Sequence, residues 1–121
     1  MSATILTVDD SRTMREMLKL ALTQAGYRVI QAEDGVHGLE VLKSETPRVI
    51  VTDINMPRMD GFGFIEHVRA DDTYRGIPIL VLTTESDAEK KDRARRAGAT
   101  GWIIKPFDPA KLIDAIRRVS A

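Results

Sequence analysis

The chain contains no cysteine among its 121 residues, so disulfides, thiolate metal sites and cysteine nucleophiles are all excluded. It has no net charge, because 18 basic residues balance 18 acidic ones, and it presents no overall positive field to attract nucleic acid. No apolar stretch approaches the roughly 18 residues that a membrane-spanning helix requires. Acidic residues follow the N-terminus before any signal-peptide core can form. We therefore expect a cytoplasmic protein that binds neither nucleic acid nor membranes.

The composition that remains is typical of a globular protein, with 43% hydrophobic and 30% charged residues. The length suits one domain with a single ordinary core. No linker, internal repeat or low-complexity tail divides the chain, and the last helical segment ends where the sequence ends. The sequence predicts one domain over residues 1–121 without an attached output domain.

Five short runs of β-branched and other apolar residues alternate with longer segments of helical period. The runs predict strands at 4–8, 28–32, 48–52, 78–82 and 101–104. The residues expected on the inner faces of the helices are Met14, Met17, Leu18, Ala21, Leu22 and Ala25; Val36, Leu39 and Leu42; Phe62, Ile65 and Val68; and Leu112, Ile113, Ile116 and Val119. Five βα units in succession predict an α/β fold in which helices cover both faces of a parallel sheet.

The helical segment at 87–96, "DAEKKDRARR", differs from the others because its only apolar residues are alanines. Its charges predict ion pairs one helical turn apart, from Glu89 to Arg93 and from Asp92 to Arg96, each worth about 0.3 kcal/mol. A helix that buries so little is expected to be among the less stable parts of the fold. Two interpretations stay open: a solvated surface helix, or a mobile face that binds a partner.

Polar residues that can bind a ligand or take part in a reaction follow the carboxyl ends of the predicted strands. They are Asp9 and Asp10 after the first strand, Asp53 after the third, Thr83 and Thr84 after the fourth, and Lys105 after the fifth. In a doubly wound sheet the loops at the carboxyl ends of the strands meet at the topological switch point, where ligands bind. We therefore expect three carboxylates, a hydroxyl group and an ammonium group to converge at one edge of the sheet.

Three clustered carboxylates repel one another unless a cation lies between them. A site with only oxygen ligands suits Mg²⁺, with Mn²⁺ as an alternative, and magnesium recruits phosphate oxygens to complete its octahedron. Lys105 supplies a second cation, and a threonine hydroxyl can bond a phosphoryl oxygen. This set predicts a site at which a phosphoryl group is transferred to a carboxylate.

Each of these residues also has a structural interpretation when it is taken alone. Asp10 or Ser11 can cap the first helix, Asp53 can be a turn residue, Thr83 can cap the charged helix, and Lys105 can be an ordinary surface lysine. The functional interpretation is preferred because these residues all fall at the carboxyl ends of different predicted strands.

Four motifs in order, "TVDDS", "VTDINMPRMDG", "VLTTES" and "WIIKPF", resemble those of the receiver domain of two-component response regulators. The resemblance covers essentially the whole chain. It implies a flavodoxin-like fold with a five-stranded sheet of order 2-1-3-4-5, as in the chemotaxis member of the family.

The resemblance implies a metal site and a phosphoacceptor. Asp53 would accept a phosphoryl group from a phosphohistidine on a chemotaxis-type (CheA-like) sensor histidine kinase. Asp10 and Asp53 would bind Mg²⁺ directly, together with the backbone carbonyl of Asn55, and Asp9 would act mainly through a metal-bound water.

Further roles follow from the same resemblance. Thr83 and Lys105 would grip the phosphoryl oxygens, and the Lys105–Pro106 bond would be cis, although only about 5–6% of X–Pro bonds are. Asn55 and Glu85 would tune the access of hydrolytic water and hence the lifetime of the phosphate.

Three other positions have competing interpretations. Arg58 either touches the phosphoryl group or the kinase, or is an ordinary exposed turn residue, which is preferred. Trp102 stands where chemotaxis receivers usually have tyrosine or phenylalanine, so it switches inward with Thr83, contacts a partner, or only covers apolar surface. His37 and His67 fall on helix surfaces and are expected to be solvated.

The resemblance favours a monomeric, stand-alone chemotaxis regulator that binds the flagellar motor switch through 87–97, 101–104 and 109–120. The alternative is a phosphorelay intermediate or phosphate sink that does not bind the motor. A phosphatase or phosphomutase is disfavoured, because Asn55 stands where that class needs a second aspartate. The chain would catalyse its own phosphorylation and dephosphorylation without being a conventional enzyme.

Overall fold

The computed structural model describes residues 3–121, in which strands and helices alternate along the chain. The strands are β1 (Thr4–Val8), β2 (Arg28–Ala32), β3 (Val49–Thr52), β4 (Ile79–Thr83) and β5 (Gly101–Ile104). The helices are α1 (Arg12–Gln24), α2 (Gly35–Ser44), α3 (Gly61–Ala70), α4 (Ala88–Ala97) and α5 (Pro109–Ser120). All five predicted strands are present, with ends shifted by at most one residue.

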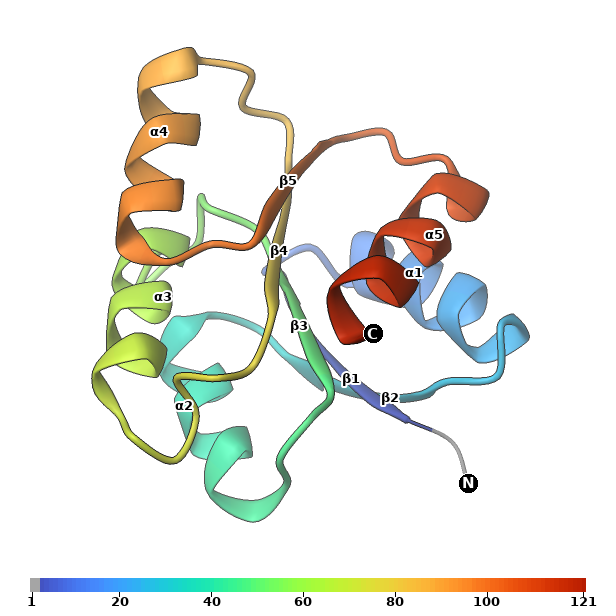
Figure 1. Cartoon of the computed structure of the whole chain (residues 1–121). Coiled ribbons are helices and arrows are strands. Elements are labelled where there is room, and N and C mark those ends of the chain that lie inside the picture. Colours follow the sequence, from blue (N-terminus) through green and yellow to red (C-terminus); the bar gives the residue numbers. More distant parts are fainter. Residues whose placement is uncertain (1–2) are drawn as a thin grey trace.

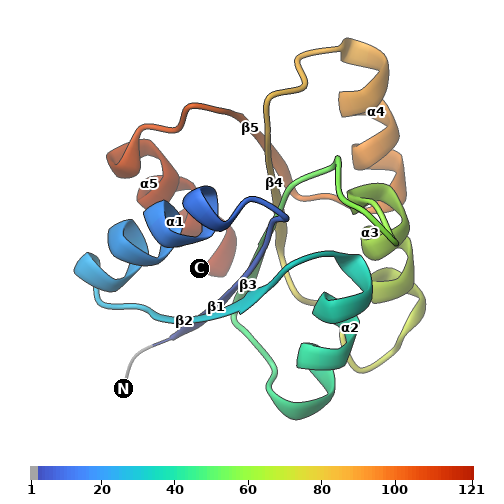
Figure 2. The same cartoon turned by 180° about the vertical axis from the view of Figure 1, so that it is seen from behind.

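The five strands form one parallel sheet in the order β2-β1-β3-β4-β5. Helices α1 and α5 cover one face, and α2, α3 and α4 cover the other (Figure 1), as the view from behind confirms (Figure 2). The predicted flavodoxin-like α/β fold with helices on both faces is therefore confirmed. The reversal of strand order between β1 and β3 places the topological switch point at the ends of these two strands.

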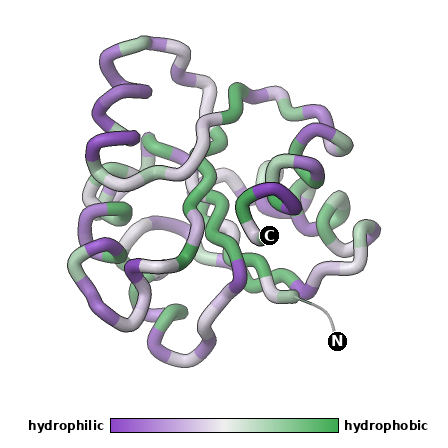
Figure 3. Tube along the Cα trace, in the orientation of Figure 1, coloured by the Kyte–Doolittle hydropathy of each residue, from purple (hydrophilic) through white to green (hydrophobic). Residues whose placement is uncertain are grey.

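Alternate residues of the central strands feed two hydrophobic cores, one on each face of the sheet. Ile50 and Val81 pack toward α2, α3 and α4, whereas Val51 and Leu82 pack toward α1 and α5. Strands β3 and β4 are buried along their whole length, which explains their continuous apolar sequences. The hydropathy colouring shows this apolar centre and the hydrophilic α4 at its margin (Figure 3).

Every helix begins with a side chain that accepts a hydrogen bond from a backbone N–H in its first turn. These caps are Ser11, Asp34, Asp60, Asp87 and Asp108. Because Ser11 caps α1 and Asp87 caps α4, neither Asp10 nor Thr83 is used as a cap.

Two local predictions are wrong. Met17 is 48% exposed, because at 100° per residue it lies about 100° around α1 from the buried Leu18 and so falls outside the inner face. The Glu89–Arg93 ion pair does not form among residues 3–121, because Arg93 lies over the ring of Phe62, 4.0 Å from its centroid.

The other predicted pair of α4, Asp92–Arg96, is present at 3.1 Å, and Asp92 also binds Arg95. Ala94 is the only fully buried residue of this helix. None of the helices in residues 3–121 is both long and apolar enough to cross a membrane.

Candidate functional site

Three carboxylates meet at the switch point. Asp9 directly follows β1 and Asp53 directly follows β3. The N–H of Asp53 donates to the carbonyl of Val8, which continues the parallel pairing of the two strands and fixes both aspartates side by side. Carboxylate oxygens of Asp9, Asp10 and Asp53 lie within 4.8 Å of one another.

Lys105 joins this cluster from the end of β5. Its ammonium group donates to Oδ2 of Asp9 at 2.8 Å and to Oδ2 of Asp53 at 2.7 Å. Its backbone N–H donates to the carbonyl of Thr83, so the pairing of β4 and β5 sets where the side chain starts. The Lys105–Pro106 bond is cis, which confirms the prediction.

Burial and neighbouring charges shift the pKa values of this cluster in opposite directions. Burial raises the pKa of Asp9, and the hydrogen bond from Lys105 only partly offsets it. Burial alone would lower the pKa of Lys105, but its bonds to Asp53 and Asp9 outweigh that effect and raise this pKa above its ordinary value. The two carboxylates therefore favour the charged form of Lys105.

The two acids after β1 have different surroundings. Asp9 is buried, and its second oxygen accepts from the N–H of Ser11 at 2.9 Å, while its carbonyl accepts from Arg15 at 2.7 Å. Asp10 is exposed. Because both oxygens of Asp9 already have protein donors, Asp10 is the acid with more freedom to bind an incoming group.

The loop after β3 is packed directly on the start of α3. Oδ1 of Asp53 accepts from the N–H of Ile54 at 2.6 Å, and the N–H of Gly61 donates to the carbonyl of Ile54 at 2.8 Å. A Cβ atom on Gly61 would lie 2.3 Å from the carbonyl oxygen of Asp53. Glycine is therefore required where α3 approaches the loop of Asp53.

Hydrogen bonds link Glu85 to both Thr83 and Asn55. Oγ1 of Thr83 accepts from the N–H of Glu85 at 3.3 Å, and the Asn55 amide donates to Oε1 of Glu85 at 2.9 Å. The same oxygen forms an ion pair with Lys90 at 3.1 Å. The Asn55 amide and then Lys90 lower the pKa of Glu85.

Arg58 belongs to a second ion pair beside the site, which the sequence did not predict. It has a left-handed backbone (φ 62°), and its guanidinium donates to both oxygens of the buried Asp34, at 2.7 and 3.1 Å. These bonds from Arg58 lower the pKa of Asp34, although burial opposes the effect. The only sequence signal for Asp34 is its place as a capping residue before a helix.

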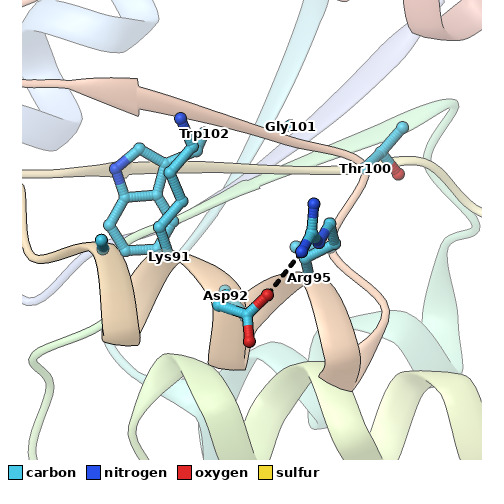
Figure 4. A pocket seen from close by; sticks show the side chains of 9 residues that line it. Lys91, Asp92, Arg95, Thr100, Gly101 and Trp102 are labelled. Atoms are coloured by element: carbon cyan, nitrogen blue, oxygen red, sulfur yellow. Dashed lines mark hydrogen bonds and ion pairs between the residues drawn. The ribbon is translucent and has the colours of Figure 1, made fainter.

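The remaining predicted residues lie away from the carboxylates. Trp102 is half-buried in a cavity between α4 and β5, and its indole extends from β5 toward α4 (Figure 4). His67 is exposed, as expected. The prediction that His37 is solvated is wrong, because this side chain is half-buried and its Nδ1 accepts from the N–H of Glu33 at 3.1 Å.

The donor set of the cluster fits a hard divalent cation. The three converging groups are all carboxylates, and the described part of the chain brings no histidine to them. Oxygen-only, carboxylate-rich sites suit Mg²⁺ or Mn²⁺ better than softer metals.

Comparison with known proteins supports the same interpretation. Chemotaxis protein CheY1 of Helicobacter pylori is 40% identical over 117 residues, which cover 95% of this chain and 94% of that protein. The structure of chemotaxis response regulator CheY4 of Vibrio cholerae is 44% identical, with a TM-score of 0.92 over 98% of this chain and 99% of that one. The receiver domain of sensor histidine kinase PA1611 from Pseudomonas aeruginosa, solved with a magnesium ion coordinated in its active site cleft, is 26% identical, with a TM-score of 0.92 over 99% of this chain and 98% of that one.

The family model of the response regulator receiver domain matches residues 5–117. With that match and a chemotaxis regulator 40% identical along almost its whole length, the chain belongs to the response regulator receiver domain family.

Proposed function

We propose that the chain accepts a phosphoryl group on Asp53 from a sensor histidine kinase and thereby changes its affinity for the flagellar motor switch. The observation that carries this proposal is the position of Lys105, whose ammonium binds Asp53 and Asp9 beside the exposed Asp10. The similarity to chemotaxis proteins of Helicobacter pylori and Vibrio cholerae supports the assignment to chemotaxis.

Asp10, Asp53 and the backbone carbonyl of Asn55 would hold Mg²⁺ directly, and Asp9 would act through a water. The magnesium ion named for the Pseudomonas receiver supports this choice, and Mn²⁺ has the same ligand preference. When bound, the cation supplies positive charge that offsets the repulsion between carboxylates and phosphoryl oxygens.

In the proposed transfer, a carboxylate oxygen of Asp53 attacks the phosphorus of the phosphohistidine. The new bond joins that oxygen to phosphorus, and the nitrogen–phosphorus bond breaks with its electron pair returning to the imidazole. Lys105 moves its hydrogen bond from Asp53 to a phosphoryl oxygen, and the hydroxyl of Thr83 donates to another. The same groups serve hydrolysis, so the chain assists its own phosphorylation and dephosphorylation.

The signal would reach the surface through Thr83. Phosphorylation adds roughly −1.5 to −2 charge at pH 7, which attracts the Thr83 hydroxyl and the loop that leads to α4. The surface of α4, β5 and α5 then repacks. A cavity of about 320 Å³ between α4 and β5, lined by Ala94, Gly101 and Trp102 with Lys91 and Arg95 at its margin, offers a partner an apolar anchor point (Figure 4).

The test of phosphoryl acceptance is Asp53→Asn. We expect this variant to take no acid-labile label from a phosphorylated chemotaxis-type kinase, because the amide is a poor nucleophile. Asp72→Asn, which changes an acid whose side chain is 88% exposed, should be labelled like the wild type. Normal labelling of the Asp53→Asn protein would refute the assignment.

The test of the partner is binding to a purified motor switch protein with and without a phosphoryl mimic. We expect the mimic to increase binding by the wild type and to have no effect on Asp53→Asn. Equal binding in both states would instead favour a phosphorelay intermediate or phosphate sink.

A further inference from the structure

A side-chain hydrogen bond joins the two loops that lead away from Asp53 and Thr83. Asn55 lies two residues after Asp53, and Glu85 lies two residues after Thr83. The Asn55 amide donates to Oε1 of Glu85 at 2.9 Å, so the two side chains connect the loop after β3 to the loop after β4. The connection therefore joins the two loops that begin at Asp53 and Thr83.

The same oxygen of Glu85 is also held by α4. Lys90, in the first turn of that helix, places Nζ 3.1 Å from Oε1. The Glu85 side chain is 26% exposed and the Lys90 side chain 43% exposed, so salt and solvent reach the pair. Lys90 neutralises the carboxylate and keeps it turned toward Asn55.

The position of α4 therefore governs this contact. The helix has one fully buried residue, Ala94, and its remaining contacts are largely made by charged side chains at the surface. Elements with so little buried surface open at low free-energy cost. A displacement of α4 carries Lys90 away from Glu85.

We propose that Lys90 is a positioning residue that sets the lifetime of the phosphoryl group, a role that rests on the proposed function of Asp53. Lys90 keeps Glu85 against Asn55 and so limits the approach of water. In the hydrolysis that Lys90 restrains, a water oxygen bonds to phosphorus and the bond between phosphorus and the Asp53 oxygen breaks. The Asp53 carboxylate is restored. Inorganic phosphate leaves with one or both protons of the water, and a proton that it does not keep passes to solvent. A partner that binds α4 and displaces Lys90 shortens the lifetime of the signal.

The test compares Lys90→Gln with Lys19→Gln in the full chain. Lysine and glutamine have similar helix propensity, so each variant keeps its helix. Lys19 lies on α1, is exposed and has no ion pair among residues 3–121, which makes it a matched control outside the proposed partner surface. Each protein is labelled by a phosphorylated kinase, the donor is removed, and the loss of label is timed.

We expect the Lys90→Gln protein to lose label about two- to fivefold faster than the wild type, because an exposed ion pair shifts populations by roughly 1.4- to 5-fold. The Lys19→Gln protein should match the wild type. High salt should speed the loss from wild-type protein and leave Lys90→Gln unchanged. In a Glu85→Gln background, Lys90→Gln should have no additional effect.

An unchanged or slower loss of label in Lys90→Gln, or an effect that persists in the Glu85→Gln background, would overturn the role of Lys90 alone. Failure of the wild-type protein to take any label would overturn the proposed function and the role of Lys90 with it.

Discussion

At the scale of single residues, buried acids at and near the site are paired with cations. Lys105 stands between the carboxylates of Asp9 and Asp53, and Arg58 neutralises Asp34 a short distance along the same edge of the sheet. Each of these acids is buried, and burying its negative charge without a cationic partner would cost free energy of folding. The two cations therefore stabilise the loops that surround the site.

The Arg58–Asp34 pair gives a pH-dependent prediction. Because Arg58 lowers the pKa of Asp34 in the folded state, its contribution is present above the unfolded pKa and is lost as the pH falls through the folded pKa. Arg58→Gln should therefore be less stable than the wild type at pH 7, and the difference should begin to narrow below about pH 4.

Urea denaturation of both proteins between neutral and acid pH would measure this difference. Arg48→Gln, at an exposed arginine without an ion pair in residues 3–121, should show no such trend. A difference between Arg58→Gln and wild type that stays constant down to pH 2 would contradict the prediction.

Sequence reasoning located some of these residues and not others for a physical reason. Asp9, Asp53 and Lys105 were found because each one ends a strand, and parallel topology brings strand ends together. The Arg58–Asp34 and Lys90–Glu85 pairs join loops and a helix turn whose side-chain directions follow no period. Such contacts depend on loop conformation, which strand and helix patterns do not describe.

At the scale of helices and strands, the burial of each element matches the pattern of its sequence. The apolar strands β3 and β4 form the centre, and α4, with alanine as its only apolar residue type, covers little of the sheet. The prediction for Met17 is wrong because this residue lies about 100° around α1 from the buried Leu18, outside the stripe that faces the core. Arg93 was assigned to Glu89 because the ring of Phe62, on another helix, is invisible to spacing within α4.

The junction of β3 and α3 gives a prediction at this scale. In Gly61→Ala the new methyl group would meet the Asp53 carbonyl at 2.3 Å and Cα of Ile54 at 2.8 Å, and both are backbone atoms that cannot move independently. We expect a loss of about 3 kcal/mol in unfolding free energy, at the upper end for overpacking, with slower labelling of Asp53.

Gly76→Ala is the matched control, because a Cβ atom there would have nothing within 4 Å. Chemical denaturation and kinase labelling of both variants would check the prediction. If the Gly61→Ala protein were as stable as the wild type, the prediction would be wrong, and α3 could start without this close approach to the Asp53 loop.

At the scale of the whole molecule, the sheet order joins separate parts of the chain into one acidic pocket whose repulsion a cation relieves. Magnesium that binds only the folded state should raise stability by about 1.4 kcal/mol at ten times its dissociation constant. Asp10→Asn should lose most of this increase. Without metal it should be at least as stable as the wild type, because the exposed Asp10 adds repulsion to the cluster.

Thermal unfolding in EDTA and in excess Mg²⁺ would measure both effects. Asp72→Asn should keep the full increase that the wild type shows. An unchanged magnesium effect in Asp10→Asn would exclude Asp10 as a ligand.

The contacts of Lys105 also have a consequence for the order in which the protein is made. Its two partners lie 96 and 52 residues earlier in the chain, so a ribosome that has finished β4 has produced all three carboxylates but not their ammonium partner. An incomplete polypeptide therefore lacks the ammonium group that lies between Asp9 and Asp53. Translation must pass the final strand before the charge-compensated pocket can form.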